Sequence, residues 1–381
     1  MTERDYFNGS DWSLEGQNRN RRYEELYKLI QPYIEQTQRW KVGMRYQFCP
    51  EMWPVSCEEV ESLKRIGRTV GKVLQAINQP PVGFRIDFVQ DVNDKFWITE
   101  VQTDDRGLPE MAILRNAYGD GNFPKGVTQS FIEALSKKFP DSQTVGIIFP
   151  DNESFYYASF YDLALICRAQ IPKQNICVLR EKEIIEPIPS FRTGQYPYET
   201  VIADIVYDFT QKFSRNNNSC FSPVGKDLLV KLLTFSGDKK CTVQDKETLN
   251  SCVPPTFNTV PENCGEKQNW VIKPIDGRWS KGVTFGRLVD RQKWEIVLEQ
   301  VKSGKAVVQK FVMPKTETLR VRTTKNGDVF YPQSDFVLRI EGYYFFDGQE
   351  YALADIMITG TKQLPVHGQR DCIMVPGKVV F

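Results

Sequence analysis

The chain has 381 residues, which is enough for two or three domains at the usual size of about 150 residues each. Hydrophobic residues make up 41% and charged residues 25%, values typical of a folded soluble protein rather than a disordered one. The 49 basic and 48 acidic residues give a net charge of +1. This balance argues against a nucleic-acid-binding or membrane-surface protein, because such proteins carry a basic excess.

The histidine and cysteine content limits which metal sites and which cysteine chemistry the chain can have. His367 is the single histidine, so metal sites built on several histidines are excluded. The nine cysteines are scattered without a CxxC pair, which is typical of reduced thiols. With no apolar leader and no apolar run of about 18 residues, we expect a soluble, cytoplasmic protein.

The first part of the chain predicts two helices and a hairpin. A helix is expected over 20–38, interrupted or bent at Pro32. A second is expected over 56–78, where Ser56 and Glu59 have the spacing of a capping box. Two apolar segments over 83–90 and 95–102 then predict a β-hairpin.

The middle and the end of the chain differ in pattern. Strands expected over 144–150, 175–180 and 200–209, with a helix over 154–170, indicate a small parallel α/β unit. The polar stretch 214–219 is interpreted as a linker. A helix over 223–235 and a mainly antiparallel region to the C-terminus complete an α+β protein.

The hairpin carries the strongest local signal. If Asn93 and Asp94 are the two central residues of its turn, Asp87 lies opposite Glu100 and Arg85 lies opposite Gln102, all on one face. The other face is then apolar, with Phe84, Ile86, Phe88, Trp97 and Val101. Carboxylates directly opposite one another repel, and Mg²⁺ between them would remove the penalty. A solvated polar face with Arg85 offsetting the acids is the alternative.

Downstream segments predict a phosphate-binding loop. A strand delivers Lys273, and the following loop holds Gly277, Lys281 and Gly282, so flexible backbone lies beside positive charge. An ordinary glycine-containing hairpin gives the same pattern. Lys226 begins a predicted helix, and the alternative interpretation is an ordinary solvated lysine at a helix start. The segment 306–312 is an apolar strand whose last residues could face an adenine, and the alternative interpretation is simply a buried strand. The chain has neither a Walker A motif nor GxGxxG.

Taken together, these segments resemble an ATP-grasp enzyme in circularly permuted order, most closely the synthetase domain of glutathionylspermidine synthase and its relatives. In that group the metal segment precedes the lysines, as it does here. Arg85-Ile86-Asp87 with Glu100-Val101-Gln102 is similar to the R-x-D and E-x-N metal segment, although Gln102 replaces the usual Asn. Lys226 and Lys273 are similar to the two ATP lysines, the glycine loop to the phosphate lid, and 309–312 to the adenine hinge.

The resemblance implies an α+β protein with a circularly permuted ATP-grasp fold and a small α/β pre-ATP-grasp unit. It divides the chain into an N-terminal segment with the metal-binding hairpin (1–138), the small α/β unit (139–213) and the nucleotide-binding region (214–381).

The resemblance also implies ATP-dependent joining of a carboxylate to an amine through an acyl phosphate, with ATP and Mg²⁺. The partners would be small-molecule substrates, neither nucleic acid nor a membrane, and a homodimer is left open. The metal ligands would be Asp87, Glu100 and Gln102. The catalytic arginines would be Arg85, Arg106 and Arg322, with Arg320 and Arg339 as further candidates for the substrate carboxylate. The nucleotide-binding residues would be Lys226, Lys273, Gly277, Lys281, Gly282, Gln309, Lys310, Phe311 and Val312.

Two other functions fit the same sequence. An ATP-grasp small-molecule kinase would use the same nucleotide site with a hydroxyl acceptor and no acyl phosphate. A non-catalytic nucleotide-binding module would keep the fold without the reaction, and Gln102 in place of Asn leaves room for that.

Overall fold

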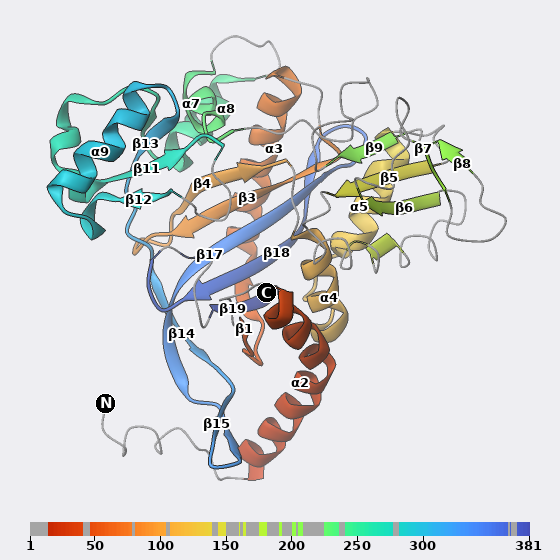
Figure 1. Cartoon of the computed structure of the whole chain (residues 1–381). Coiled ribbons are helices and arrows are strands. Elements are labelled where there is room, and N and C mark those ends of the chain that lie inside the picture. The colour runs from red at the N-terminus through yellow and green to blue at the C-terminus, as the bar shows by residue number, and fades with distance from the viewer. Residues whose placement is uncertain are drawn as a thin grey trace.

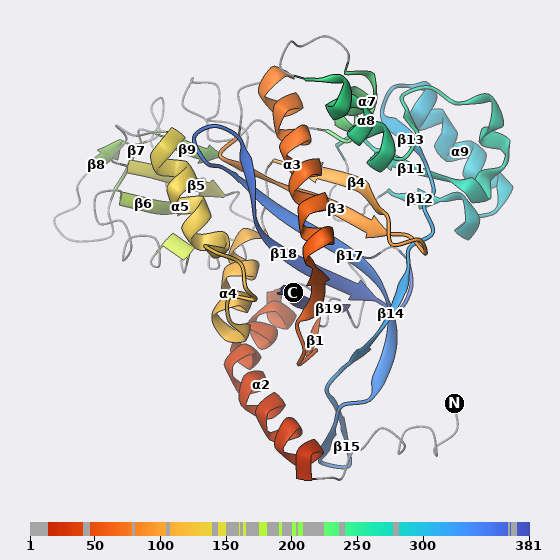
Figure 2. The same cartoon turned by 180° about the vertical axis from the view of Figure 1, so that it is seen from behind.

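The structure is a computed structural model, shown from opposite sides in Figures 1 and 2. It describes residues 14–40, 46–77, 81–103, 107–138, 144–149, 160, 163–164, 175–180, 190–192, 200–202, 205–208, 225–235, 241–276, 282–364, 366 and 372–381. Within these ranges every helix is too short or too polar to cross a lipid bilayer.

A large mixed sheet forms the centre of the molecule (Figure 1). Its strands are β1 (Tyr46–Gln47), β2 (Trp53–Ser56), β3 (Gly83–Gln90), β4 (Phe96–Gln102), β14 (Thr316–Arg320), β17 (Gln333–Phe346), β18 (Tyr351–Thr361) and β19 (Cys372–Val380). They run in the order β1-β19-β18-β17-β3-β4, with β14 beside β17 and β2 beside β19. Because β3 pairs antiparallel with β17, segments from the N-terminal and C-terminal parts of the chain share this sheet.

Helix α3 (Cys57–Ile77) covers one face of the sheet (Figure 2). It begins with the expected capping box, in which Ser56 N–H donates to Glu59 Oε2 at 2.8 Å and Glu59 N–H donates to Ser56 Oγ at 3.2 Å. Gly67 allows the helix to lie close to β17, since a Cβ there would be 1.9 Å from the Tyr344 ring. The Tyr344 hydroxyl donates to the carbonyl of Leu63 at 3.0 Å and ties β17 to the helix.

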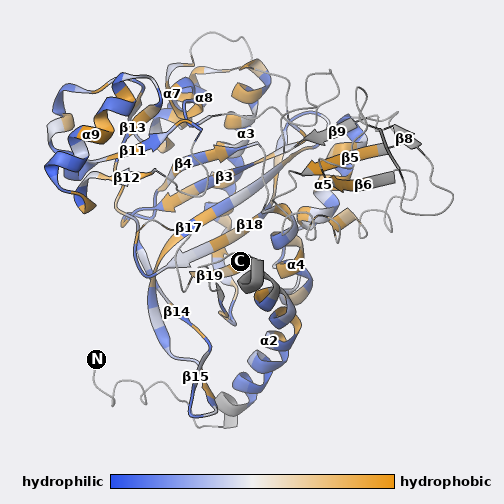
Figure 3. Ribbon diagram, viewed as in Figure 1, coloured by the Kyte–Doolittle hydropathy of each residue, from blue (hydrophilic) through white to orange (hydrophobic). Residues whose placement is uncertain are grey.

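Three helices cover part of the opposite face. They are α2 (Leu14–Trp40), α4 (Leu108–Tyr118) and α5 (Gly126–Lys138). Pro32 does not interrupt α2, which continues through it as one helix. It buries Ile30 and Ile34, and Figure 3 shows it as largely hydrophilic, as expected of a helix that packs along a narrow stripe.

The middle of the chain contains the expected parallel sheet. It runs in the order β6-β5-β9 and consists of β5 (Thr144–Phe149), β6 (Asn175–Arg180) and β9 (Ile205–Asp208). One expectation is wrong: the strand predicted over 200–209 is two strands, because β8 (Thr200–Ile202) pairs with β7 (Ser190–Arg192) while β9 pairs with β5. An apolar run of this length can be divided between two partners. The predicted linker 214–219 lies outside the described residues.

A second, smaller sheet lies beside the β3–β4 hairpin (Figure 1). Its antiparallel strands are β10 (Thr256–Phe257), β11 (Trp270–Pro274), β12 (Thr284–Phe285) and β13 (Ala306–Lys310), in the order β10-β13-β11-β12. Helix α9 (Arg291–Lys302) packs on it, with Trp294, Val297 and Val301 in a core shared with Ile272 and Val308.

The remaining elements are short. They are α7 (Leu228–Thr234), α8 (Val243–Cys252), β15 (Thr323–Lys325), β16 (Asp328–Phe330) and 3-10 turns at Glu262–Gly265, Lys267–Asn269 and Gly286–Leu288. The helix predicted from 223 thus begins at Leu228. Asp245 in α8 accepts from Lys72 Nζ at 2.8 Å and from Thr69 Oγ1 at 3.0 Å, which ties α8 to α3. The division of the chain at 138/139 and 213/214 stays a prediction.

Candidate active site

The β3–β4 hairpin has the predicted register at its polar positions. Asp87 lies opposite Glu100, and Arg85 lies opposite Gln102. The predicted two-residue turn is wrong, because Asp91 N–H donates to Lys95 O at 3.0 Å and three residues lie between them. A register shift between Asp87 and Phe88 restores the pairing. The longer turn shifts the pairing by one residue and the bulge shifts it back, so Asp87 and Glu100 still lie opposite each other.

Thr99 is the extra residue of this bulge. Its neighbours Ile98 and Glu100 pair with Phe88 and Asp87, which leaves Thr99 without a partner in the ladder. The Thr99 hydroxyl donates to the carbonyl of Asp87 at 3.0 Å. This bond holds the two strands together where the ladder is interrupted.

The bulge also corrects the predicted core face. Trp97 was expected beside Phe84 and Ile86, but it pairs with Val89 and so lies on the polar face. Its Nε1 donates to Asp91 Oδ2 at 2.8 Å. Ile98 is fully buried in its place, with Phe96 beside it in the core. An extra residue in one strand reverses the inward and outward alternation on one side of the bulge.

Asp87 belongs to a buried cluster of two guanidiniums and two carboxylates. Its Oδ1 accepts from Arg85 Nε at 2.8 Å, and its Oδ2 lies 3.4 Å from Arg339 Nη1. Glu341, directly opposite Asp87 on β17, lies 3.2 Å from Arg85 Nη1 and accepts from Arg339 Nε at 3.0 Å. The formal charges of these four side chains sum to zero.

The two acids of this cluster titrate differently. Burial raises the pKa of Asp87, and the carboxylates of Glu341 and Glu100 raise it further against the effect of the arginines. Burial alone would also raise the pKa of Glu341, but the guanidiniums of Arg339 and Arg85 lower it to about 2. Glu341 is therefore fully charged at neutral pH and holds both arginines.

Two buried lysines reach the hairpin from the small sheet and the turn beside it. Lys273 on β11 donates from Nζ to the carbonyl of Thr99 at 2.7 Å. Lys226, in the turn before α7, lies with Nζ 3.3 Å from Glu100 Oε1. Its N–H donates to Ile275 O at 3.2 Å, which places this turn at the end of β11. Burial lowers the pKa of Lys273 to about 8; nearby Glu100 opposes this and nearby Lys226 adds to it.

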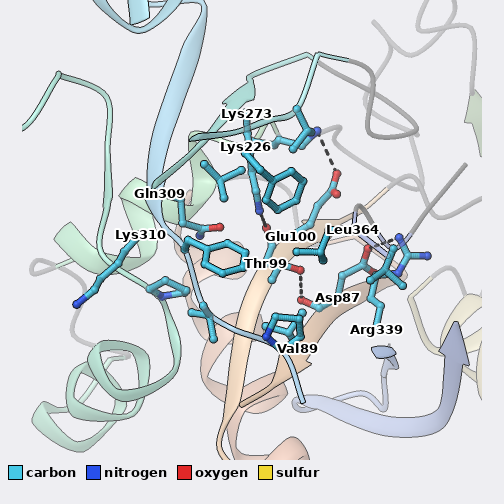
Figure 4. Close-up of a pocket in the computed structure, with 18 residues that line it drawn as sticks. Asp87, Val89, Thr99, Glu100, Lys226, Lys273, Gln309, Lys310, Arg339 and Leu364 are labelled. Carbon is cyan, nitrogen blue, oxygen red and sulfur yellow. Dashed lines mark hydrogen bonds and ion pairs between the residues drawn. The ribbon is translucent and has the colours of Figure 1, made fainter. Parts of the chain in front are cut away.

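Five of these charged groups line one pocket between the hairpin and the small sheet, namely Asp87, Glu100, Lys226, Lys273 and Arg339 (Figure 4). The pocket has about 790 Å³ of empty space, counting the part that is open to solvent. It is lined by Asp87, Val89, Thr99, Glu100, Lys226, Pro254, Val271, Lys273, Val283, Phe285, Gln309, Lys310, Phe311, Val312, Pro314, Arg339, Leu364 and Val366. In Figure 4, Asp87 and Arg339 lie at one side, the lysines in the middle, and Gln309 and Lys310 at the far side.

The predicted hinge segment 309–312 lines the apolar side of this pocket. Gln309 is buried, and its Nε2 donates to Thr256 Oγ1 at 3.0 Å. The N–H groups of Lys310 and Phe311 donate to Pro255 O at 2.8 Å and Asn269 O at 2.7 Å. These two amides are therefore engaged within the protein. A ligand edge would have to meet other groups of the segment, such as Val312.

Two of the three predicted metal ligands fit a hard cation. Asp87 and Glu100 are carboxylates that face each other across the hairpin and line the pocket, and oxygen ligands suit Mg²⁺. Glu100 is 29% exposed at its side chain and accessible from the pocket. Gln102 lies on the same face but does not line the pocket. Among the described residues, no group of three or more His, Cys, Asp or Glu side chains is placed to hold a metal.

Several predicted residues lie elsewhere or outside the described ranges. Arg322 is not in the pocket but pairs with Glu24 of α2, its Nε 2.8 Å from Oε1, and its guanidinium lies over the Tyr27 ring. Arg85 does not line the pocket, but it pairs with Asp87, which does. Gly282 has a φ of 76°, which glycine adopts without strain. Arg106, Gly277, Lys281 and His367 lie outside the described residues.

Two residues of the site, Glu341 and Thr99, were not among those predicted from the sequence. Glu341 joins it because β17 pairs with β3, a contact between residues more than 200 positions apart that no local pattern indicates. Thr99 joins it because a bulge turns its carbonyl toward Lys273. The pattern of apolar residues in the second strand could have indicated that bulge. Phe96 and Ile98 are more apolar than Trp97, so they suit the core face better than Trp97 does.

No protein-family model and no curated protein sequence matches this chain. Among solved structures, a glutathione synthetase-like effector from Globodera pallida, in its apo form, aligns with a TM-score of 0.53 over 95% of this chain and 99% of that one, at 9% identity. A putative gamma-glutamylcysteine synthetase from Methylobacillus flagellatus aligns with a TM-score of 0.42 and 11% identity, over 80% of each chain. D-alanyl-alanine synthetase A from Vibrio cholerae aligns at 0.26 and 8%, over 55% of this chain and 87% of that one.

The first of these similarities establishes the fold alone, and it extends over nearly the whole of both chains. This chain therefore shares the mixed α/β fold of that glutathione synthetase-like effector. The circular permutation and the pre-ATP-grasp identity of the parallel unit stay predictions.

The two buried ammonium groups predict a site for a polyanion with a defined pH dependence. Because the pKa of Lys273 is lowered to about 8, this side chain is charged near pH 7 and loses its proton as the pH rises through about 8. We expect the affinity for inorganic tripolyphosphate, measured by calorimetry, to fall about tenfold per pH unit above about pH 8.

Lys273→Met provides the control for this measurement. It should bind tripolyphosphate more weakly than the wild type and lose the pH dependence over the same range. A wild-type affinity that stays constant to about pH 10 would contradict the assignment of Lys273 as an anion ligand.

Proposed function

We propose that this chain is an ATP-dependent carboxylate–amine ligase that forms an amide bond through an acyl phosphate. The observation that carries the proposal is the convergence of Lys226 and Lys273 on the Asp87–Glu100 pair of the hairpin in one pocket. Buried cations and a carboxylate pair at one end, with an apolar slot at the other, suit a nucleoside triphosphate with its metal.

Different lining residues would bind different parts of the nucleotide. The apolar side with Phe285, Phe311 and Val312 would take the base, and the lysines would bind the phosphates. Arg339 and Asp87 lie at the opposite side, where the terminal phosphate would be transferred (Figure 4). The substrate carboxylate would attack the γ-phosphorus and release ADP. The amine would then attack the acyl carbon, form the C–N bond, lose a proton and release inorganic phosphate.

This chemistry depends on positioning and charge stabilisation rather than on a titrating base. A site composed of arginines, lysines and carboxylates is therefore sufficient, and no role is required of the single histidine. Glu100 and Asp87 would hold Mg²⁺, which supplies neutralisation of phosphate charge when bound. Gln102, outside the pocket lining, is left without a direct role in this assignment.

The direct test is release of ADP from MgATP in the presence of panels of carboxylic acids and amines. A ligase should release ADP only when both substrates are present, and hydroxylamine should trap the acyl phosphate as a hydroxamate. ADP release with a hydroxyl acceptor and no hydroxamate would indicate a kinase instead. Absence of any binding of MgATP, measured by calorimetry, would contradict both enzymatic functions.

Glu100→Gln is the sharpest variant for the proposed metal site. It keeps the size of the side chain and removes the charge, so we expect turnover to fall by at least about a hundredfold with little change in melting temperature. Glu317→Gln is a matched control, since Glu317 is also 29% exposed and pairs with Lys315 at 2.7 Å, but does not line the pocket. Equal activity of the two variants would contradict the role of Glu100.

A further inference from the structure

Glu341 is fully buried and does not line the pocket, yet it contacts two charged groups of the site. It accepts from Arg339 Nε at 3.0 Å and also pairs with Arg339 Nη2, so one edge of that guanidinium is committed to it. Thr359, opposite Arg339 on β18, donates from Oγ1 to the same Glu341 oxygen at 2.8 Å. The acid is thus fixed from two strands.

Because Nε and Nη2 of Arg339 pair with Glu341, Nη1 is the guanidinium nitrogen that remains to contact a ligand. A guanidinium has three donor nitrogens in one plane, and a carboxylate that takes Nε and Nη2 fixes the plane and the direction of Nη1. Nη1 lies 3.4 Å from Asp87 Oδ2, at the pocket side of the cluster. Without the Glu341 charge, Asp87 would be the carboxylate partner left to Arg339 among the described residues, and Arg339 would share it with Arg85.

The place of Arg339 in the pocket defines what it would meet. It lies on the side opposite Lys310, with Lys226 and Lys273 in between (Figure 4). A nucleotide with its base beside Phe311 and its inner phosphates on the lysines would direct its terminal phosphate toward Arg339.

We propose that Glu341 is a positioning residue that holds the Arg339 guanidinium against the terminal phosphate of the bound nucleotide. This inference rests on the proposed function, because it requires a nucleoside triphosphate in the pocket. Glu341 acts through Arg339 and makes no contact with the ligand.

The test compares two nucleotides in the presence of Mg²⁺ by calorimetry: ADP and a non-hydrolysable ATP analogue with an imido bridge before its terminal phosphate. In Glu341→Gln we expect the affinity for the analogue to fall about tenfold, because a charge-assisted contact is misplaced, while the affinity for ADP stays within about twofold. A merely structural role of Glu341 would lower both affinities together.

Asp355→Asn is the matched control. Asp355 pairs with Arg115 Nε at 2.9 Å, is as deeply buried as Glu341, and lies on the same sheet but not in the pocket. This variant loses a comparable ion pair, so it should leave the ratio of the two affinities unchanged. If it changes the ratio as much as Glu341→Gln does, the inference is wrong.

A second variant keeps the inference testable if Glu341→Gln does not fold. Thr359→Val removes one hydrogen bond to Glu341 and no charge, and it should weaken the analogue about threefold with ADP unaffected. An unchanged ratio in every folded variant, or an equal loss for both nucleotides, would overturn the role of Glu341. If the wild type binds neither nucleotide, the proposed function itself fails and the inference falls with it.

Discussion

The hydrogen bond from Lys273 Nζ to the carbonyl of Thr99 joins the two sheets on which the site depends. Lys273 belongs to the small sheet, and Thr99 belongs to a hairpin that extends the large one. Desolvating an ammonium group is costly, and the carbonyl and the nearby Glu100 carboxylate offset part of that cost. The cost that remains is visible as the lowered pKa of Lys273.

The charges around this contact are arranged for an anionic ligand. Among the described residues of the site, the cations Arg85, Arg339, Lys226 and Lys273 lie beside the carboxylates of Asp87, Glu100 and Glu341. The arginines are balanced by Asp87 and Glu341, whereas the two lysines share Glu100. A polyphosphate beside these lysines would add negative charge next to their ammonium groups.

The secondary structure near the site was largely predictable because its signals are local. The capping box of α3 and the strand expected over 83–90 rest on patterns of neighbouring residues, and both are confirmed. The opposition of Asp87 and Glu100 was also predicted, although through a turn that is wrong. It held because the bulge at Thr99 compensated for the longer turn, which a residue count cannot foresee.

What the sequence could not reveal depends on pairing between distant segments. Glu341 enters the cluster only because β17 lies beside β3. Arg322 fits an arginine that binds a substrate carboxylate by residue type alone, yet the fold places it against Glu24 of α2. An arginine in a strand carries no local sign of which carboxylate it will meet, so its role is settled by tertiary packing.

The central claim is that one nucleotide lies between the hairpin and the small sheet. A crystal structure of the protein with Mg²⁺ and a non-hydrolysable ATP analogue tests it most directly. The account predicts phosphate oxygens within hydrogen-bond distance of Lys226 and Lys273, with the base beside Phe311. A nucleotide bound elsewhere, or a pocket that stays empty while Lys273 still bonds to Thr99, would contradict it.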